Sequence, residues 1–162
     1  MILEARASSC FSYPYVLKLD GRAVGKFDGR WFSESLDIHL TGRRKLIFEK
    51  IGWGGSEFVL KSEEPDAFFG HAKRAGFFSS QWNLDLSAGP IELVHAGWFS
   101  SSYEIKQGER TIGNVDRLGW CERGWQAQAA GVASMEDLLL IGMVYQTIQR
   151  RQQAAAAHGA GS

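Results

Sequence analysis

The sequence predicts a mainly β protein, an antiparallel barrel of about twelve strands in two related halves that encloses a C-terminal hydrophobic helix. Three observations favour this fold class. Aromatic residues recur at turns with spacings of 22, 24, 21 and 22 residues, at positions Trp31, Trp53, Phe77, Trp98 and Trp120. The runs between them alternate apolar and polar residues, as antiparallel strands with one wet face do. The segment 138–144 is apolar on every face of a helix and must therefore be surrounded.

The first half of the chain reads as consecutive hairpins. Asp20-Gly21 separates "YVLKL" from "RAVGKF", and this pair supplies the positive φ angles that a tight turn needs. Thr41-Gly42 separates "SLDIHL" from "KLIFEKI". The segment 62–67, "SEEPDA", is the one stretch that resembles a longer loop. Eleven strands follow from the whole count, or twelve if the N-terminal "ILEARA" also pairs.

The second half repeats this organisation. "SAGP", residues 87–90, separates "WNLDL" from "IELVH". In the next hairpin, "YEIK" and "ERTIGNV" flank Gln107-Gly108 and repeat the pattern of the first hairpin. The matching positions are Tyr15 with Tyr103, Lys18 with Lys106, Gly21 with Gly108 and Gly25 with Gly113. This likeness predicts two related halves.

A helix closes the chain at about 135–150. Ser134 and Asp137 predict a capping box, in which the Ser oxygen accepts an early backbone N–H and the Asp carboxylate reaches back. We expect one domain over 1–151, since 162 residues suit a single core. Residues 152–162 show no packing pattern, and we expect a disordered tail.

Composition limits the partners. Eighteen basic residues balance eighteen acidic ones, so no nucleic-acid partner is expected. Cys10 and Cys121 form no metal-binding motif, and the favoured interpretation is two reduced thiols. The N-terminus does not resemble a secretory signal, which predicts a cytoplasmic protein. The apolar stretch 138–148 is shorter than the roughly 18–20 residues that span a bilayer, so the chain is not expected to span a membrane.

Motifs of catalysis are missing from the sequence. It contains no GxSxG elbow, HExxH, GxGxxG or P-loop, which favours a non-enzyme without a cofactor. The four histidines, His39, His71, His95 and His158, are widely spread. A barrel could bring some of them together, but surface or half-buried imidazoles are the favoured interpretation, and no metal site is predicted.

The order of these elements resembles the tubby C-terminal-like superfamily, which includes the LURP-one-related proteins and the phospholipid scramblases. The likeness rests on the hairpin "YEIKQGERTIGNVDRLGW", on "YVLKLDGRAVGKFDGRW" and on the ending "SMEDLLLIGMVYQTI". It implies a barrel around a buried central helix, and a function at membranes, where tubby domains bind phosphoinositide headgroups and scramblases handle phospholipids. The sequence lacks the acidic calcium-binding insertion, the membrane-spanning extension and the cysteine-rich palmitoylated segment of a scramblase.

Two basic segments are the candidate headgroup site. They would lie on loops of one rim and hold a phosphorylated headgroup through charge-assisted hydrogen bonds. Solvated turn charges that discourage edge pairing are the alternative interpretation. The first hypothesis is thus a non-enzymatic module, cytoplasmic or peripheral at a membrane, that binds a phosphoinositide, another anionic lipid or a protein partner. The candidate residues are Arg43, Arg44, Lys45, Lys73 and Arg74.

The turn aromatics support a second hypothesis, a β protein that binds a small ligand or a carbohydrate. Exposed indole faces stack on sugars, so this hypothesis requires solvent-exposed Trp side chains at the turns. The favoured interpretation is structural instead: one ring per hairpin would plug the ends of the barrel while its N–H finds a turn carbonyl.

Overall fold

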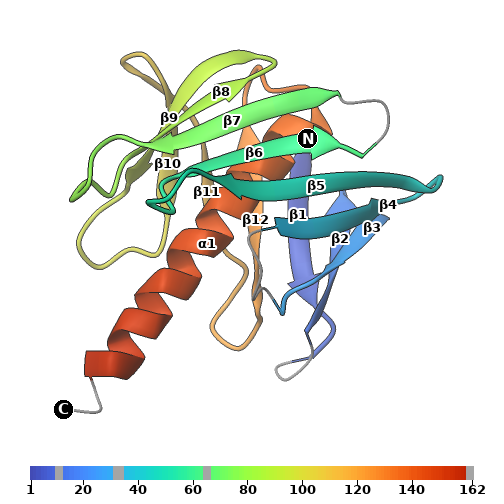
Figure 1. Ribbon diagram of the computed structural model, residues 1–162, viewed down its shortest axis with the longest axis horizontal. Helices are drawn as coiled ribbons and strands as arrows, with labels where there is room; N and C mark the ends of the chain where they lie inside the picture. Colours follow the sequence, from blue (N-terminus) through green and yellow to red (C-terminus); the bar gives the residue numbers. More distant parts are fainter. Residues whose placement is uncertain (10–12, 31–34, 64–66, 160–162) are drawn as a thin grey trace.

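Twelve antiparallel strands form a closed barrel, as predicted (Figure 1). The computed structural model describes residues 1–9, 13–30, 35–63 and 67–159. Each strand pairs with its neighbours in sequence, and β1 closes the ring between β2 and β12. The strands are β1 (Ile2–Ala7), β2 (Pro14–Leu19), β3 (Arg22–Asp28), β4 (Ser35–Leu40), β5 (Arg44–Ile51), β6 (Glu57–Ser62), β7 (Phe68–Arg74), β8 (Trp82–Leu86), β9 (Gly89–His95), β10 (Tyr103–Gln107), β11 (Arg110–Arg117) and β12 (Gly124–Ala129).

The two hairpins with similar sequences also share their geometry. The β2–β3 pair shifts register between Leu17 and Lys18, and the β10–β11 pair shifts between Ile105 and Lys106. The tight turn of the first hairpin has the two positive φ angles expected, 48° at Asp20 and 83° at the following glycine. The matching hairpins lie eight strands apart in the chain, so the repeat relates hairpins rather than successive six-strand halves.

The helix α1 (Met135–Gly159) runs through the barrel (Figure 1). Every residue from Asp137 to Ile148 is buried, which confirms the prediction of an enclosed helix. Its neighbours include β1, β6, β7, β11 and β12. Small residues let the backbones approach: a Cβ on Gly70 of β7 would lie 2.7 Å from a Leu140 methyl carbon. On the helix itself, Gly142 faces the ring of Trp125, which is only 1% exposed.

The start of α1 differs in part from the predicted capping box. The Ser134 hydroxyl accepts the Asp137 backbone N–H at 3.3 Å, as expected. The Asp137 carboxylate does not reach back along its own chain. It accepts hydrogen bonds from the Ser87 backbone N–H at 2.9 Å, the Ser87 hydroxyl at 2.6 Å and the Ala88 N–H at 3.1 Å. A buried carboxylate is stabilised by several N–H and O–H donors, and the turn between β8 and β9 provides them.

The helix also ends later than predicted. Residues 152–159, expected to belong to a disordered tail, continue α1 as exposed turns of helix. The run of four alanines, 154–157, explains this extension because alanine has the highest helix propensity. The last residues of the predicted tail, 160–162, lie outside the described residues.

The antiparallel order gives the barrel two different ends. Connections from even to odd strands are mostly tight polar turns, and α1 enters beside the one at 87–88. Connections from odd to even strands include the loops 52–56, 75–81, 96–102 and 118–123. The helix leaves among them, since Tyr145 donates to the Ser101 carbonyl at 3.0 Å and Arg151 donates to the Gly55 carbonyl. We call these four loops the aromatic rim, and the opposite end the turn rim.

Candidate functional site

The side chains that give the aromatic rim its name point into solvent. Their exposed fractions lie between 83% and 106%, and the residues are Trp53, Phe77, Phe78, Trp98, Phe99 and Trp120. The prediction that these rings plug the barrel is therefore wrong for Trp53, Phe77, Trp98 and Trp120, while Trp31 lies outside the described residues. The space is already filled by α1, Tyr103 and the two tryptophans within strands, Trp82 and Trp125.

Two loops of the rim are built alike. The loop 75–81 reads "AGFFSSQ" and the loop 96–102 reads "AGWFSSS". In the first, the Ser79 N–H donates to the Gly76 carbonyl at 3.0 Å, and in the second, the Ser100 N–H donates to the Gly97 carbonyl at 3.1 Å. Each hydrogen bond closes a four-residue turn whose two central residues are aromatic. The same geometry therefore presents two aromatic rings from each loop.

Further hydrogen bonds fix both loops to the strands below. In each loop the hydroxyl of the turn serine accepts a backbone N–H two residues later, at 3.0 Å in both cases. The last side chain of the preceding strand holds the carbonyl of that serine: Arg74 Nε donates to Ser79 at 2.6 Å, and His95 Nε2 lies 2.7 Å from the Ser100 oxygen. The aromatic pairs are thus exposed by ordered turns.

The predicted headgroup residues do not form one site. Arg43, Arg44 and Lys45 lie at the turn between β4 and β5, on the turn rim. Arg44 forms an ion pair with Glu136 at 2.7 Å and covers the ring of Phe69. Burial raises the pKa of Glu136, but hydrogen bonds from its own backbone N–H, from Arg44 and from the Ser134 hydroxyl lower it below the ordinary value overall.

Lys45, Lys73 and Arg74 also form ion pairs or hydrogen bonds. Lys45 lies 2.9 Å from a Glu63 oxygen, and this hydrogen bond raises the pKa of the ammonium group. Lys73 and Arg74 lie at the opposite end of the barrel, because β7 ends at the aromatic rim. Lys73 is 3.4 Å from Glu57, whose pKa is lowered by hydrogen bonds from His71 and then from Lys73. Of the five candidates, only Lys73 and Arg74 lie beside the exposed aromatic residues.

Four arginines that sequence reasoning did not select join Arg74 at this end. Arg117 ends β11, Arg123 precedes β12, and Arg150 and Arg151 lie where the helix leaves the barrel. Burial lowers the pKa of Arg151, and the charge of Arg74 lowers it further. We call these five arginines the basic collar. The sequence contains a signal for two of them, because "DRLGWCERGW" places Arg117 and Arg123 on either side of Trp120.

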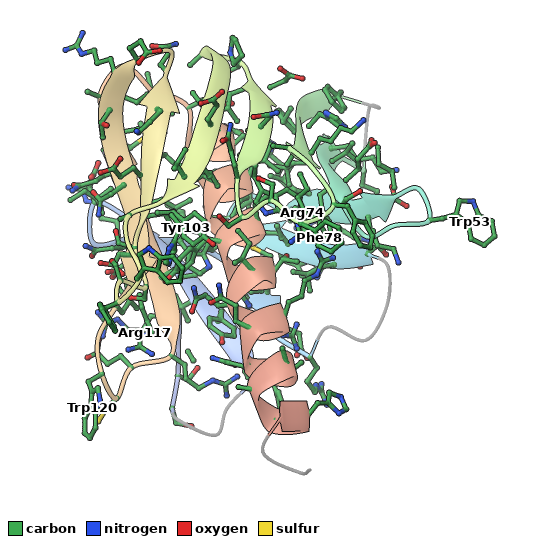
Figure 2. All side chains as sticks on the ribbon, turned by 90° about the vertical axis from the view of Figure 1, so that its left-hand side faces the viewer. Trp53, Arg74, Phe78, Tyr103, Arg117 and Trp120 are labelled. Atoms are coloured by element: carbon green, nitrogen blue, oxygen red, sulfur yellow. The ribbon has the colours of Figure 1, made fainter. Side chains whose placement is uncertain are left out.

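The rim projects in several directions. Trp53 and Trp120 lie on opposite sides of the emerging helix, and Phe78 lies close to Arg74 between them (Figure 2).

The Cys121 thiol is exposed next to Trp120, while Cys10 lies outside the described residues. Within the described part of the chain, no cluster of three His, Cys, Asp or Glu residues could hold a metal ion. No helix in the same residues has the length and apolarity needed to cross a membrane.

Comparisons with known proteins bear on the fold alone. No protein-family model matches the chain, and neither does any curated protein. Among solved structures, the chain is similar to the X-ray structure of the protein AT5G01750 from Arabidopsis thaliana, with a TM-score of 0.58 at 10% sequence identity. The match covers 93% of this chain and 91% of that chain. An agreement of this extent supports the barrel with its helix as a fold that a second sequence also adopts.

Proposed function

We propose that this protein is a non-enzymatic module that docks on an anionic membrane surface through its aromatic rim. The observation that carries the proposal is the pair of equivalent loops that expose Phe77, Phe78, Trp98 and Phe99. Burying one such ring fully is worth about 1.5–3 kcal/mol, so leaving four in water on ordered turns is costly unless a partner covers them. The resemblance to tubby-like and scramblase proteins points to the same class of partner.

A lipid surface suits the arrangement of the rim's rings. Trp53, Phe78 and Trp120 come from separate loops around the emerging helix (Figure 2), and a fluid surface can accommodate such isolated projections. Tryptophan and phenylalanine are the side chains that interfacial proteins place at the headgroup level. The basic collar supplies the complementary charge, worth about 1 kcal/mol for each arginine close to an anionic leaflet.

The test is co-sedimentation with phosphatidylcholine vesicles that contain or lack phosphatidylserine. Replacing Phe77 and Phe78 together with Ser should weaken binding at least about tenfold, since two insertion sites are lost. Phe68 offers a matched control because it is 62% exposed but begins β7 at the turn rim. Phe68→Ser should leave binding unchanged. An equal loss in both variants would mean that the aromatic rim is not the docking surface.

The same assay separates this proposal from the headgroup site predicted at residues 43–45. Arg43→Gln changes an exposed residue on the turn rim, and we expect no effect on sedimentation. A large loss with Arg43→Gln and none with the Phe77 and Phe78 variant would move the site to the turn rim. Blue-shifted tryptophan emission on vesicle addition, reduced by Trp98→Ser, would report contact at the rim directly.

A second candidate function is binding of a small ligand or a carbohydrate. The exposure of Trp53, Trp98 and Trp120 favours it, because this hypothesis requires tryptophans that solvent can reach. Titration of the protein with soluble oligosaccharides, without vesicles, tests it through tryptophan emission. Saturable quenching that Trp98→Ser or Trp120→Ser abolishes would support a lectin-like protein, whereas emission that changes with vesicles alone would support membrane docking.

A further inference from the structure

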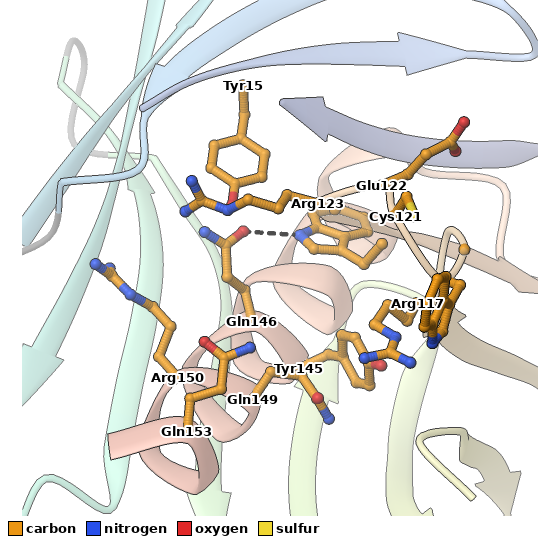
Figure 3. A pocket seen from close by; sticks show the side chains of 14 residues that line it. Tyr15, Arg117, Cys121, Glu122, Arg123, Tyr145, Gln146, Gln149, Arg150 and Gln153 are labelled. Carbon is orange, nitrogen blue, oxygen red and sulfur yellow. Dashed lines mark hydrogen bonds between the residues drawn. The ribbon is translucent and has the colours of Figure 1, made fainter. Parts of the chain in front are cut away.

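A cleft opens between the emerging helix and the loop that carries Trp120 (Figure 3). Its volume is about 340 Å³, near the lower end of the range of about 300–1,000 Å³ that is usual for ligand sites. One wall is the helix segment around 145–153, the other is the loop 118–123 with the strand ends beside it, and Tyr15 of β2 closes one side. The cleft lies on the aromatic rim, and its three arginines belong to the basic collar, but its three glutamines have no part in membrane docking.

The helix wall has a regular chemical pattern. Gln146, Gln149, Arg150 and Gln153 follow the spacing i, i+3, i+4 and i+7, which places them on one face of a helix. All four line the cleft. Gln146 is held in place because its carbonyl oxygen accepts the Trp125 Nε1–H at 2.9 Å. Its NH₂ group, like those of the other two glutamines, is a hydrogen-bond donor.

The opposite wall adds positive charge. Arg117 and Arg123 line it at the two ends of the loop, so three guanidinium groups surround the cleft together with Arg150 (Figure 3). Burial lowers the pKa of Arg150, the nearby Tyr15 counteracts this, and the charge of Arg123 lowers the pKa again. Arg150 still carries its positive charge at neutral pH, since arginine does not lose its charge in proteins.

The lining offers little negative charge in return. Its one carboxylate belongs to Glu122, which forms an ion pair with Arg6 at 2.7 Å. Figure 3 shows the Glu122 carboxylate turned away from Arg123 and Arg150. Three cations and three amides that line one small cleft are the donor set that a compact anion with several acceptor oxygens requires.

We propose that this cleft binds one phosphomonoester group, with Arg123 and Arg150 as the main charged contacts and the glutamine amides as further donors. A phosphomonoester carries a charge of about −1.5 to −2 at neutral pH and three acceptor oxygens, which matches these groups. The group could belong to a soluble phosphoester or to a lipid headgroup that reaches the cleft from a docked membrane. The site goes beyond membrane docking, because a soluble ligand would occupy it without any vesicle.

The first experiment measures soluble ligands by isothermal titration calorimetry at constant ionic strength, with glycerol 3-phosphate, inorganic phosphate and glycerol. We expect saturable binding of the two phosphates and none of glycerol. Arg150→Gln should weaken binding at least tenfold. Arg151→Gln is the matched control, because this neighbour reaches the Gly55 carbonyl on another side of the helix. An equal loss in both variants, or no saturable binding of either phosphate, would overturn the proposal.

The second experiment uses vesicles of phosphatidylcholine with either phosphatidic acid, whose headgroup is a phosphomonoester, or phosphatidylserine at matched surface charge. A lipid source predicts a preference for phosphatidic acid that Arg150→Gln removes, while a soluble source predicts no preference but intact binding of glycerol 3-phosphate. Vesicle binding that is insensitive to Arg150→Gln, combined with no binding of soluble phosphate, refutes the cleft and leaves membrane docking intact. Binding of glycerol 3-phosphate without any vesicle binding refutes membrane docking and supports the cleft.

Discussion

Replacing Gly142 with Ala tests how closely the helix fits inside the barrel. In an exposed helix this change would stabilise the protein by about 1 kcal/mol, because alanine is the better helix former. Here the added Cβ would lie 2.0, 2.1 and 2.4 Å from three carbon atoms of the Trp125 ring. These separations are 1 Å or more short of ordinary contact, and any shift of the Trp125 ring, which is 1% exposed, would strain its hydrogen bond to Gln146.

The two effects have opposite signs, and packing should dominate. Overpacking a core costs about 1–3 kcal/mol, and a displaced indole would also lose its buried hydrogen bond, worth about 1 kcal/mol more. We therefore expect Gly142→Ala to lower the free energy of unfolding by roughly 2 kcal/mol, a fall in Tm of about 4–8 °C. Urea and thermal denaturation measure this directly. A variant as stable as the parent, or more stable, would refute the close approach of Gly142 and Trp125.

A control and a rescue make the result specific. Gly76→Ala adds a methyl group where the nearest atom is 3.8 Å away, so its stability should change by less than about 0.5 kcal/mol. Trp125→Phe shrinks the facing ring, and Gly142→Ala should cost less in that background. A double-mutant cycle with no coupling between Gly142 and Trp125 would place the strain elsewhere.

Three further predictions concern buried polar groups. Asp137→Ala should cost about 3 kcal/mol in urea denaturation, because three donors at the 87–88 turn lose their acceptor; a loss below about 1 kcal/mol would contradict this. Gln146→Leu should cost about 1–3 kcal/mol by leaving the Trp125 N–H unpaired, and additional Trp125→Phe should recover part of it. Burial raises the pKa of Tyr145 to about 12, so the folded protein favours the neutral phenol. The stability that this preference contributes is complete below pH 10 and is lost as pH rises from 10 to 12. Tm should therefore fall over this pH range, and Tyr145→Phe should make the fall smaller.

Much of the barrel could be predicted because its determinants are local. Turn residues and two-residue alternation mark each hairpin, and successive hairpins pair in sequence order. The segment Leu138–Val144 required enclosure because it has no polar face. The extension of the helix to Gly159 has no packing pattern that marks it, because it follows from alanine propensity alone.

The site was harder to predict because it depends on the direction in which side chains at turns point and on whether an odd or even number of strands separates two loops. An aromatic residue beside a turn can fold inward or outward, and the sequence is the same in both cases. The inward position was not available here, because Trp82, Trp125 and the helix occupy the core. Parity decides which loops share a rim: an odd number of strands, β5 to β7, separates Arg43 from Arg74, so the two residues lie at opposite ends of the barrel.

The sequence by itself determined a β-barrel of consecutive hairpins around a central helix, since alternation, turn chemistry and an all-apolar helix are properties of neighbouring residues. Only the tertiary structure decided that the recurring aromatic residues face solvent and that Arg117, Arg123 and Arg150 surround one cleft. The physical reason is that exposure and convergence depend on how the helix fills and leaves the barrel. That packing joins segments far apart in the chain, and no local pattern records it.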